Sequence, residues 1–218
     1  MKPYYDDGKG IVIYNGDCRE VLPTLGRFDL LLTDPPYGIG ADNQRKILSR
    51  EKLAKPKDYG NTNWDDSPAD QKTLDVAISQ SDAAIVFGGN YFAFPPSPCW
   101  LVWDKDNTGD FADCELAWTN LKKAVRKFRW RWNGMLQEHS GEKKETRQHP
   151  TQKPLPLMRW CLSLVPDAAT VLDCYCGSGT TLVAAKLEGR SATGIEISEK
   201  YCEVAANRLR QGVLDFGE

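Results

Sequence analysis

The stretch TVLDCYCGSGTT, residues 170–181, joins an apolar run, an acid, a glycine-rich turn and the start of a helical pattern. Glycines at 177 and 179 allow a tight turn and close approach of a ligand, and amides at a helix N-terminus donate hydrogen bonds there. Glu196 ends the next apolar run, where an acid accepts from ribose hydroxyls. Leu182 replaces the third glycine of the pattern G-x-G-x-x-G, so a plain strand-to-helix turn is the alternative. The whole combination predicts the nucleoside-binding half of a sheet.

Apolar runs typical of strands alternate with helical patterns along the chain. The expected strands are 11–14, 28–33, 83–88, 99–103, 125–132, 170–174 and 192–195, and the expected helices are 68–80, 155–164, 180–188 and 198–211. This alternation predicts an α/β fold, a doubly wound and mostly parallel sheet with helices on both faces. A chain of 218 residues suits a single domain, 1–218. The stretches 41–66 and 137–148 lack a regular pattern, which is typical of binding loops.

A second stretch, LLLTDPPYGIG at residues 30–40, begins as a buried strand and stops abruptly. Two successive prolines lack N–H donors and fix φ, so neither a helix nor a sheet ladder continues. An ordinary strand-ending turn is one interpretation. The other is that this edge holds a planar amine, whose two N–H groups donate to the Asp34 carboxylate and the Pro35 carbonyl while Tyr37 stacks on its ring.

Composition favours a cytoplasmic protein without metal or membrane span. The seven cysteines lack framework spacing, which fits reduced thiols, and no apolar run reaches the roughly 20 residues that a bilayer needs. Cys174 and Cys176 lack a second Cys/His pair nearby, so no zinc site is expected. The net charge of −2 does not itself require a nucleic-acid partner.

Basic residues are nevertheless concentrated locally. They cluster within 45–57, and between 121 and 137 six basic residues occur without an acid. The run KFRWRW, residues 127–132, alternates as an edge strand would, with its rings facing the core and Lys127, Arg129 and Arg131 facing outward. Such charges either remain in water or contact phosphates, and interleaved rings also suit single-stranded nucleic acid.

Six short motifs together resemble the S-adenosylmethionine-dependent DNA amino-methyltransferases of the permuted β type. They are NGDC at 15–18, TDPPYG at 33–38, FGGNYF at 87–92, HPTQKP at 149–154, LDCYCGSGTT at 172–181 and GIEIS at 194–198. The resemblance implies a Rossmann-like methyltransferase sheet with circularly permuted motif order, because the catalytic strand precedes the cofactor strand. Related enzymes that modify glutamine amides or RNA amines resemble the unpermuted order. One departure is Cys174-Tyr175, where the family usually has Pro-Phe.

The same resemblance assigns roles to residues. The implied catalytic residues are Asp34, Pro35, Pro36 and Tyr37. The implied residues around S-adenosylmethionine are Asp17, Cys18, Thr151, Gln152, Lys153, Asp173, Tyr175, Cys176, Gly177, Ser178, Gly179, Thr180, Glu196 and Ile197. Lys127, Arg129 and Arg131 are expected to contact DNA, and the segments 41–66 and 104–148 are expected to face it.

The resemblance implies a site-specific enzyme of restriction-modification type that methylates N6 of an adenine flipped out of double-stranded DNA. Asp34 favours adenine, since the cytosine enzymes of the family tend to carry Ser at that position. An N4-cytosine methyltransferase and, in another class, a catalytically silent nucleic-acid-binding module are the alternatives. Both a monomer and a homodimer are compatible with the sequence.

Overall fold

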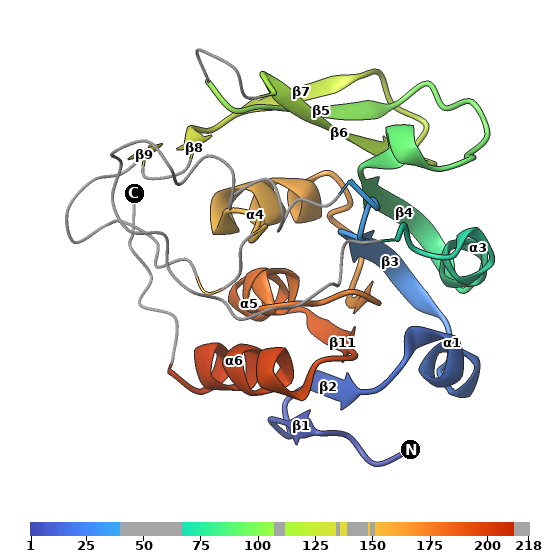
Figure 1. Cartoon of the computed structure of the whole chain (residues 1–218), viewed down its shortest axis with the longest axis vertical. Helices are drawn as coiled ribbons and strands as arrows, with labels where there is room; N and C mark the ends of the chain where they lie inside the picture. Colours follow the sequence, from blue (N-terminus) through green and yellow to red (C-terminus); the bar gives the residue numbers. More distant parts are fainter. Residues whose placement is uncertain (40–66, 107–111, 134–135, 139–147, 149–150, 212–218) are drawn as a thin grey trace.

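A computed structural model describes residues 1–39, 67–106, 112–133, 136–138, 148 and 151–211 (Figure 1). Within these residues one sheet of nine strands has the order β1-β2-β11-β10-β3-β4-β6-β5-β7, and β8 pairs with β9 separately. The strands are β1 Tyr5–Asp6, β2 Ile11–Asn15, β3 Phe28–Thr33, β4 Ser81–Phe87, β5 Trp100–Asp104, β6 Cys114–Thr119, β7 Arg126–Arg129, β8 Trp132–Asn133, β9 Leu136–Gln137, β10 Thr170–Asp173 and β11 Ser191–Glu196. The α-helices are α1 Cys18–Val21, α3 Gln71–Ser79, α4 Leu155–Ser163, α5 Thr180–Leu187 and α6 Glu199–Arg210, and two 3₁₀ turns are η1 Leu22–Thr24 and η2 Gly89–Tyr91.

The centre of the sheet is parallel and its margins are mixed. Strands β2, β11, β10, β3 and β4 run parallel to one another. At the margins β1 pairs antiparallel with β2, β6 pairs antiparallel with both β4 and β5, and β7 runs parallel to β5. The predicted α/β class with a mostly parallel sheet is confirmed.

Side-chain alternation along β3 divides the interior into two cores. Leu30 and Leu32 pack in a cluster with side chains of α4, α5 and α6, while Leu31 packs on the other face in a cluster with residues of α1 and α3. All three leucines have no exposed surface. Figure 1 shows α4, α5 and α6 on one side of the strands and α1 and α3 on the other, as a doubly wound sheet requires.

The strand β3 lies directly beside β10, with Leu31 opposite Leu172. The chain continues from β10 to β11 on one side and from β3 to β4 on the other. The β3–β10 junction is therefore a topological switch point, and ligands of such sheets bind at the carboxyl ends of the strands there. This neighbourhood explains how the permuted motif order can still build one site.

Several element predictions need correction. The strand expected over 125–132 is interrupted, because β7 ends at Arg129 and β8 begins at Trp132. The helix expected from residue 68 begins at Gln71, since the Asp70 carboxylate caps it by accepting from the Thr73 amide at 3.1 Å. Strand β6 was not expected at all. No helix of the described ranges has the length and apolar character to cross a membrane.

Candidate active site

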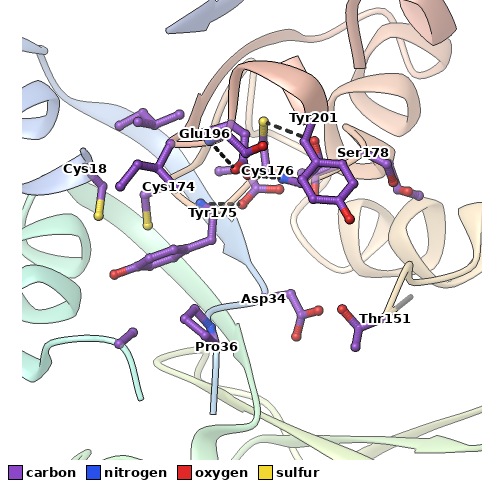
Figure 2. A pocket seen from close by; sticks show the side chains of 18 of the residues that line it. Cys18, Asp34, Pro36, Thr151, Cys174, Tyr175, Cys176, Ser178, Glu196 and Tyr201 are labelled. Atoms are coloured by element: carbon purple, nitrogen blue, oxygen red, sulfur yellow. Dashed lines mark hydrogen bonds between the residues drawn. The ribbon is translucent and has the colours of Figure 1, made fainter. Parts of the chain in front are cut away.

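A cavity of about 400 Å³ opens at the carboxyl ends of β3, β10 and β11, and Figure 2 shows side chains from these ends around it. Its lining includes the ranges 16–19, 68–70, 151–153, 173–178 and 195–198. This volume falls in the range typical of small-molecule and cofactor sites. Segments far apart in the sequence thus supply one concave surface.

Almost every residue expected around the cofactor lines this cavity, and Gly179 is the exception. A Cβ atom at Gly179 would lie 2.8 Å from the Cβ of Ala205, and φ at Gly179 is +77°. Gly179 therefore lets α5 begin close against α6. The expectation that both turn glycines approach a ligand is supported for Gly177 alone, which lines the cavity.

Glu196 ends β11 with its carboxylate held by backbone donors. The Gly177 amide donates to Oε2 at 2.9 Å and the Ser198 amide donates to Oε1 at 2.8 Å. Burial raises the pKa of this carboxyl group, although these amides oppose the shift. Each carboxylate oxygen has a second lone pair, so Glu196 can still accept from hydroxyl groups in the cavity. This arrangement fits a ribose.

Asp173 joins the two motif-bearing strands. The Thr33 hydroxyl, at the end of β3, donates to Asp173 Oδ1 at 2.8 Å, and the Tyr175 amide donates to the same oxygen at 3.2 Å. Burial raises the pKa of Asp173 to about 6. Because Asp34 follows Thr33 directly, this hydrogen bond fixes the Asp-Pro-Pro edge relative to the glycine turn.

Asp17 begins α1 at another edge of the cavity. Its carboxylate caps the helix by accepting from the Arg19 amide at 2.9 Å, and it pairs with the Arg19 guanidinium at 2.5 Å. Arg19 lowers the pKa of Asp17. The neighbouring Cys18 also lines the cavity, as expected.

Both oxygens of the Asp34 carboxylate accept hydrogen bonds from side chains. The Tyr37 hydroxyl donates to Oδ1 at 2.5 Å, and the Lys153 ammonium donates to Oδ2 at 2.5 Å. Burial raises the pKa of Asp34, while Lys153 opposes this shift. Asp34 and Pro36 line the cavity, whereas Pro35 and Tyr37 do not. Figure 2 shows Asp34 on a different side of the cavity from Glu196.

The Tyr37 ring already has an aromatic partner. It stacks on Tyr91 with centroids 5.0 Å apart and an interplanar angle of 13°. A Cβ atom at Gly88 would lie 2.0 Å from Tyr37 Cε1, so glycine at 88 makes room for the ring. The motif at 87–92 therefore supports Tyr37 through packing.

A buried ion-pair network, which the sequence did not predict, surrounds Lys153. Its ammonium lies 3.2 Å from Glu115 Oε2 as well as 2.5 Å from Asp34, and Glu115 also pairs with Lys105. Burial disfavours the charged ammonium, but Asp34 and Glu115 outweigh it and raise the pKa of Lys153. Burial likewise disfavours the Glu115 carboxylate, but Lys153 and Lys105 lower its pKa to about 2. Lys153 lines the cavity as expected, but its charge is directed at Asp34.

Comparison with known proteins decides the family. A family model described as DNA methylase matches residues 54–207, which is more than half of the chain. The chain belongs to this family. Type II methyltransferase M2.DpnII of Streptococcus pneumoniae is 39% identical over 262 residues, covering 95% of this chain and 92% of that protein. Type II methyltransferase M.ScaI of Streptomyces caespitosus is 24% identical over 275 residues, covering 95% and 84%.

Solved structures agree with this methylase assignment. The crystal structure of an M1.HpyAVI–SAM complex has a TM-score of 0.55 and 25% identity, covering 90% of this chain and 98% of that one. A PvuII DNA methyltransferase, titled cytosine-N4-specific, has a TM-score of 0.58 and 15% identity, covering 100% and 91%, which supports the shared fold. The predicted methyltransferase fold and the predicted cofactor, S-adenosylmethionine, are confirmed.

Strand β7 and the residues that follow it to Arg131, here called the basic strand, lie away from the cavity at the edge of the sheet of this methylase. Lys127 pairs with Asp104 at 3.1 Å, and Arg129 pairs with Asp106 at 2.6 Å. Arg131, which follows β7, pairs with the other oxygen of Asp106. All three basic side chains are substantially exposed. The rings of Phe128 and Trp130 pack against the core, as the edge-strand interpretation expected, although the edge strand itself ends at Arg129.

Some predictions lie outside the described residues. These are the segment 41–66, most of 137–148, and the first two residues of the motif at 149–154. Among the described residues no group of three or more His, Cys, Asp or Glu side chains could hold a metal ion. All seven cysteines are free thiols.

Proposed function

We propose that this DNA methylase transfers a methyl group from S-adenosylmethionine to N6 of an adenine flipped out of double-stranded DNA. The observation that carries the proposal is the position of Asp34, which lies in the wall of the same cavity as Glu196 and Gly177. A carboxylate that can accept hydrogen bonds from an amine and an edge that can bind a nucleoside thus face the same cavity. Asp34, Pro35, Pro36 and Tyr37 form the catalytic edge in this proposal.

The residues that line the cavity fit the cofactor. Glu196 offers acceptor capacity to ribose hydroxyls, Gly177 lets the backbone approach the cofactor closely, and Tyr175 offers a ring edge to the adenine. When bound, S-adenosylmethionine supplies an electrophilic methyl group, whose bond to sulfur breaks as a bond to the amine nitrogen forms. Asp17, Cys18, Thr151 and Gln152 complete the surrounding wall.

The catalytic edge acts by positioning and electrostatics. An exocyclic amine is a poor nucleophile because its lone pair is delocalised into the ring. Hydrogen bonds from the amine to the Asp34 carboxylate and the Pro35 carbonyl favour a pyramidal nitrogen whose lone pair points into the cavity, and these bonds strengthen as positive charge develops on that nitrogen. The amine then loses a proton to solvent water to give the neutral methylated product. A flipped base stacks on the Tyr37–Tyr91 pair.

The choice of adenine rests on Asp34. A carboxylate is a stronger acceptor than the hydroxyl of a serine, and it polarises the amine accordingly. The alternative is N4 of cytosine, whose amine has the same geometry at this edge.

DNA contact is proposed for the basic strand. Lys127, Arg129 and Arg131 are exposed on one edge and can exchange their carboxylate partners for phosphates. We place the segments 41–66 and 104–148 on the DNA-facing side of a single domain, 1–218, that acts in the cytoplasm.

The test is nucleoside mass spectrometry of methylation-free DNA incubated with the protein and S-adenosylmethionine. The expected product is N6-methyladenine. Appearance of N4-methylcytosine instead would overturn the base assignment and leave the role of Asp34 intact. Cofactor binding in calorimetry without any methyl transfer would identify a silent binding module.

A further inference from the structure

Asp34 is neutralised before any substrate arrives. Its Oδ2 accepts from the Lys153 ammonium and its Oδ1 accepts from Tyr37, both at 2.5 Å. A carboxylate that is paired with a cation polarises a neutral amine less, and the amine must compete with charge-assisted donors for the same oxygens. The catalytic edge therefore needs a way to release Lys153.

A second carboxylate, that of Glu115, lies beside the same ammonium. Glu115 Oε2 lies 3.2 Å from Lys153 Nζ, an ion-pair contact that falls short of hydrogen-bond geometry, and this buried oxygen has no other partner among the described residues. The other oxygen, Oε1, pairs with Lys105. A buried acceptor without a hydrogen bond is costly and therefore calls for an explanation.

We propose that Glu115 receives the Lys153 ammonium when the target amine reaches Asp34, so that Glu115 is a positioning residue that unmasks the catalytic carboxylate. This inference rests on the proposed function, because it assumes that Asp34 accepts the amine. The ammonium carries three donors on a flexible stem, and it already contacts both carboxylates. A small rotation moves its hydrogen bond from Asp34 Oδ2 to Glu115 Oε2.

Moving the Lys153 ammonium from Asp34 to Glu115 costs little free energy, because the net charge of the surrounding group does not change. Asp34, Glu115, Lys105 and Lys153 together are neutral, and they remain neutral wherever Lys153 points. Lys153 is 6% exposed, so its release from Asp34 without another counter-ion would leave a buried, unpaired cation. Glu115 removes that cost, and Lys105 keeps Glu115 ionised and in place.

The test is a double-mutant cycle on methyl transfer to DNA at saturating cofactor. Glu115→Gln is expected to lower the rate about tenfold or more while the cofactor dissociation constant stays unchanged, because Lys153 then remains on Asp34. In the Lys153→Met background the same Glu115→Gln change is expected to have less than about a twofold effect, because there is no ammonium to receive. Glu203→Gln, on an exposed part of α6, is the matched control and is expected to leave the rate unchanged.

Three outcomes would overturn the proposal. The first is a full rate in Glu115→Gln, and the second is an equal loss in both backgrounds, which indicates a merely structural role. The third is a crystal structure with DNA and an unreactive cofactor analogue in which Lys153 still contacts Asp34; the expected structure has Lys153 on Glu115 and the amine on Asp34. Absence of methyl transfer by the wild-type protein is a distinct result that would remove the proposed function, and this inference with it.

Discussion

The carboxyl groups around the cavity of this methylase differ in pKa because their neighbours differ. Burial raises the pKa of Asp173 to about 6, since its partners are hydroxyls and an amide. Glu115 is partly buried as well, but two lysines lower its pKa to about 2. For Asp34 burial dominates and raises the pKa, with Lys153 acting in the opposite direction. The charge state of the catalytic edge thus depends on one lysine.

Replacing Lys153 by Met is expected to raise the pKa of Asp34 further. Tyr37, Lys153 and Glu115 face this carboxyl group, and Lys153 alone among them is a cation. In the proposed mechanism activity requires ionised Asp34 and is lost as the pH falls through its pKa, so the acidic limb of the methyl-transfer profile should move to higher pH. Lys9→Met, at an exposed turn, serves as the control. An acidic limb at the wild-type position would contradict this electrostatic account.

Glu196→Ala is expected to weaken S-adenosylmethionine binding by about 1.5 to 3 kcal/mol, because it removes a charged acceptor from the ribose hydroxyls. Calorimetry measures the dissociation constant directly. Glu203→Ala, an equal truncation away from the cavity, should change nothing. An unchanged dissociation constant in Glu196→Ala would exclude Glu196 from the cofactor site.

The end of β4 supports the end of β3 through side-chain packing. Gly88 follows β4 with φ +65°, and a Cβ atom there would lie 2.0 Å from Tyr37 Cε1. Gly88→Ala is therefore expected to displace the Tyr37 ring and lower methyl transfer by about tenfold or more, while cofactor affinity is retained.

The matched control for this change is Gly8→Ala. Gly8 also has φ +65°, but nothing lies within 4 Å of a Cβ atom placed there. Backbone strain is thus similar in both variants and only the contact with Tyr37 differs. Equal activity losses in the two variants would indicate that strain alone is responsible.

Strands with uniform apolar runs were predictable from the sequence. The run at β3 matches its predicted span, Phe28–Thr33, because both faces of that strand are buried. Strand β6 was missed because Glu115 and an exposed Cys114 interrupt its apolar pattern. The acid inside CELAWT was itself a signal, since a charge within a buried strand usually has a partner. Its partner, Lys153, could not be identified from the sequence, because only the fold brings β6 next to residue 153.

The position of the cavity was predictable from the sequence motifs that line it. Glycine turns, the acid at the end of β11 and the Asp-Pro-Pro edge each have a local pattern, and a parallel sheet brings their strand ends together. Contacts between side chains that lack such a pattern were not predictable. The Tyr37–Tyr91 stack and the contact between Gly179 and Ala205 are examples, because each depends on packing between separate elements.

The side chains of the basic strand are already paired with carboxylates of the same chain, so DNA binding requires these pairs to open. Arg129 and Arg131 share Asp106, so a phosphate must replace an internal carboxylate. Changing both arginines to Gln is expected to weaken DNA binding and to flatten its salt dependence by about one counterion per lost phosphate contact, without changing cofactor affinity. Arg27→Gln, at another exposed pair with Asp82, is the control. An unaltered salt slope would leave the basic strand with a structural role alone.

Methyl transfer by Asp34→Ala shows whether Asp34 holds the target amine beside the cofactor cavity. Transfer of a tritiated methyl group to DNA and calorimetric binding of S-adenosylmethionine are measured on the same preparation. We expect the transfer rate to fall by roughly a hundredfold or more while cofactor binding persists, because the acceptor that stabilises the developing charge is gone. A wild-type transfer rate in Asp34→Ala would contradict the mechanism.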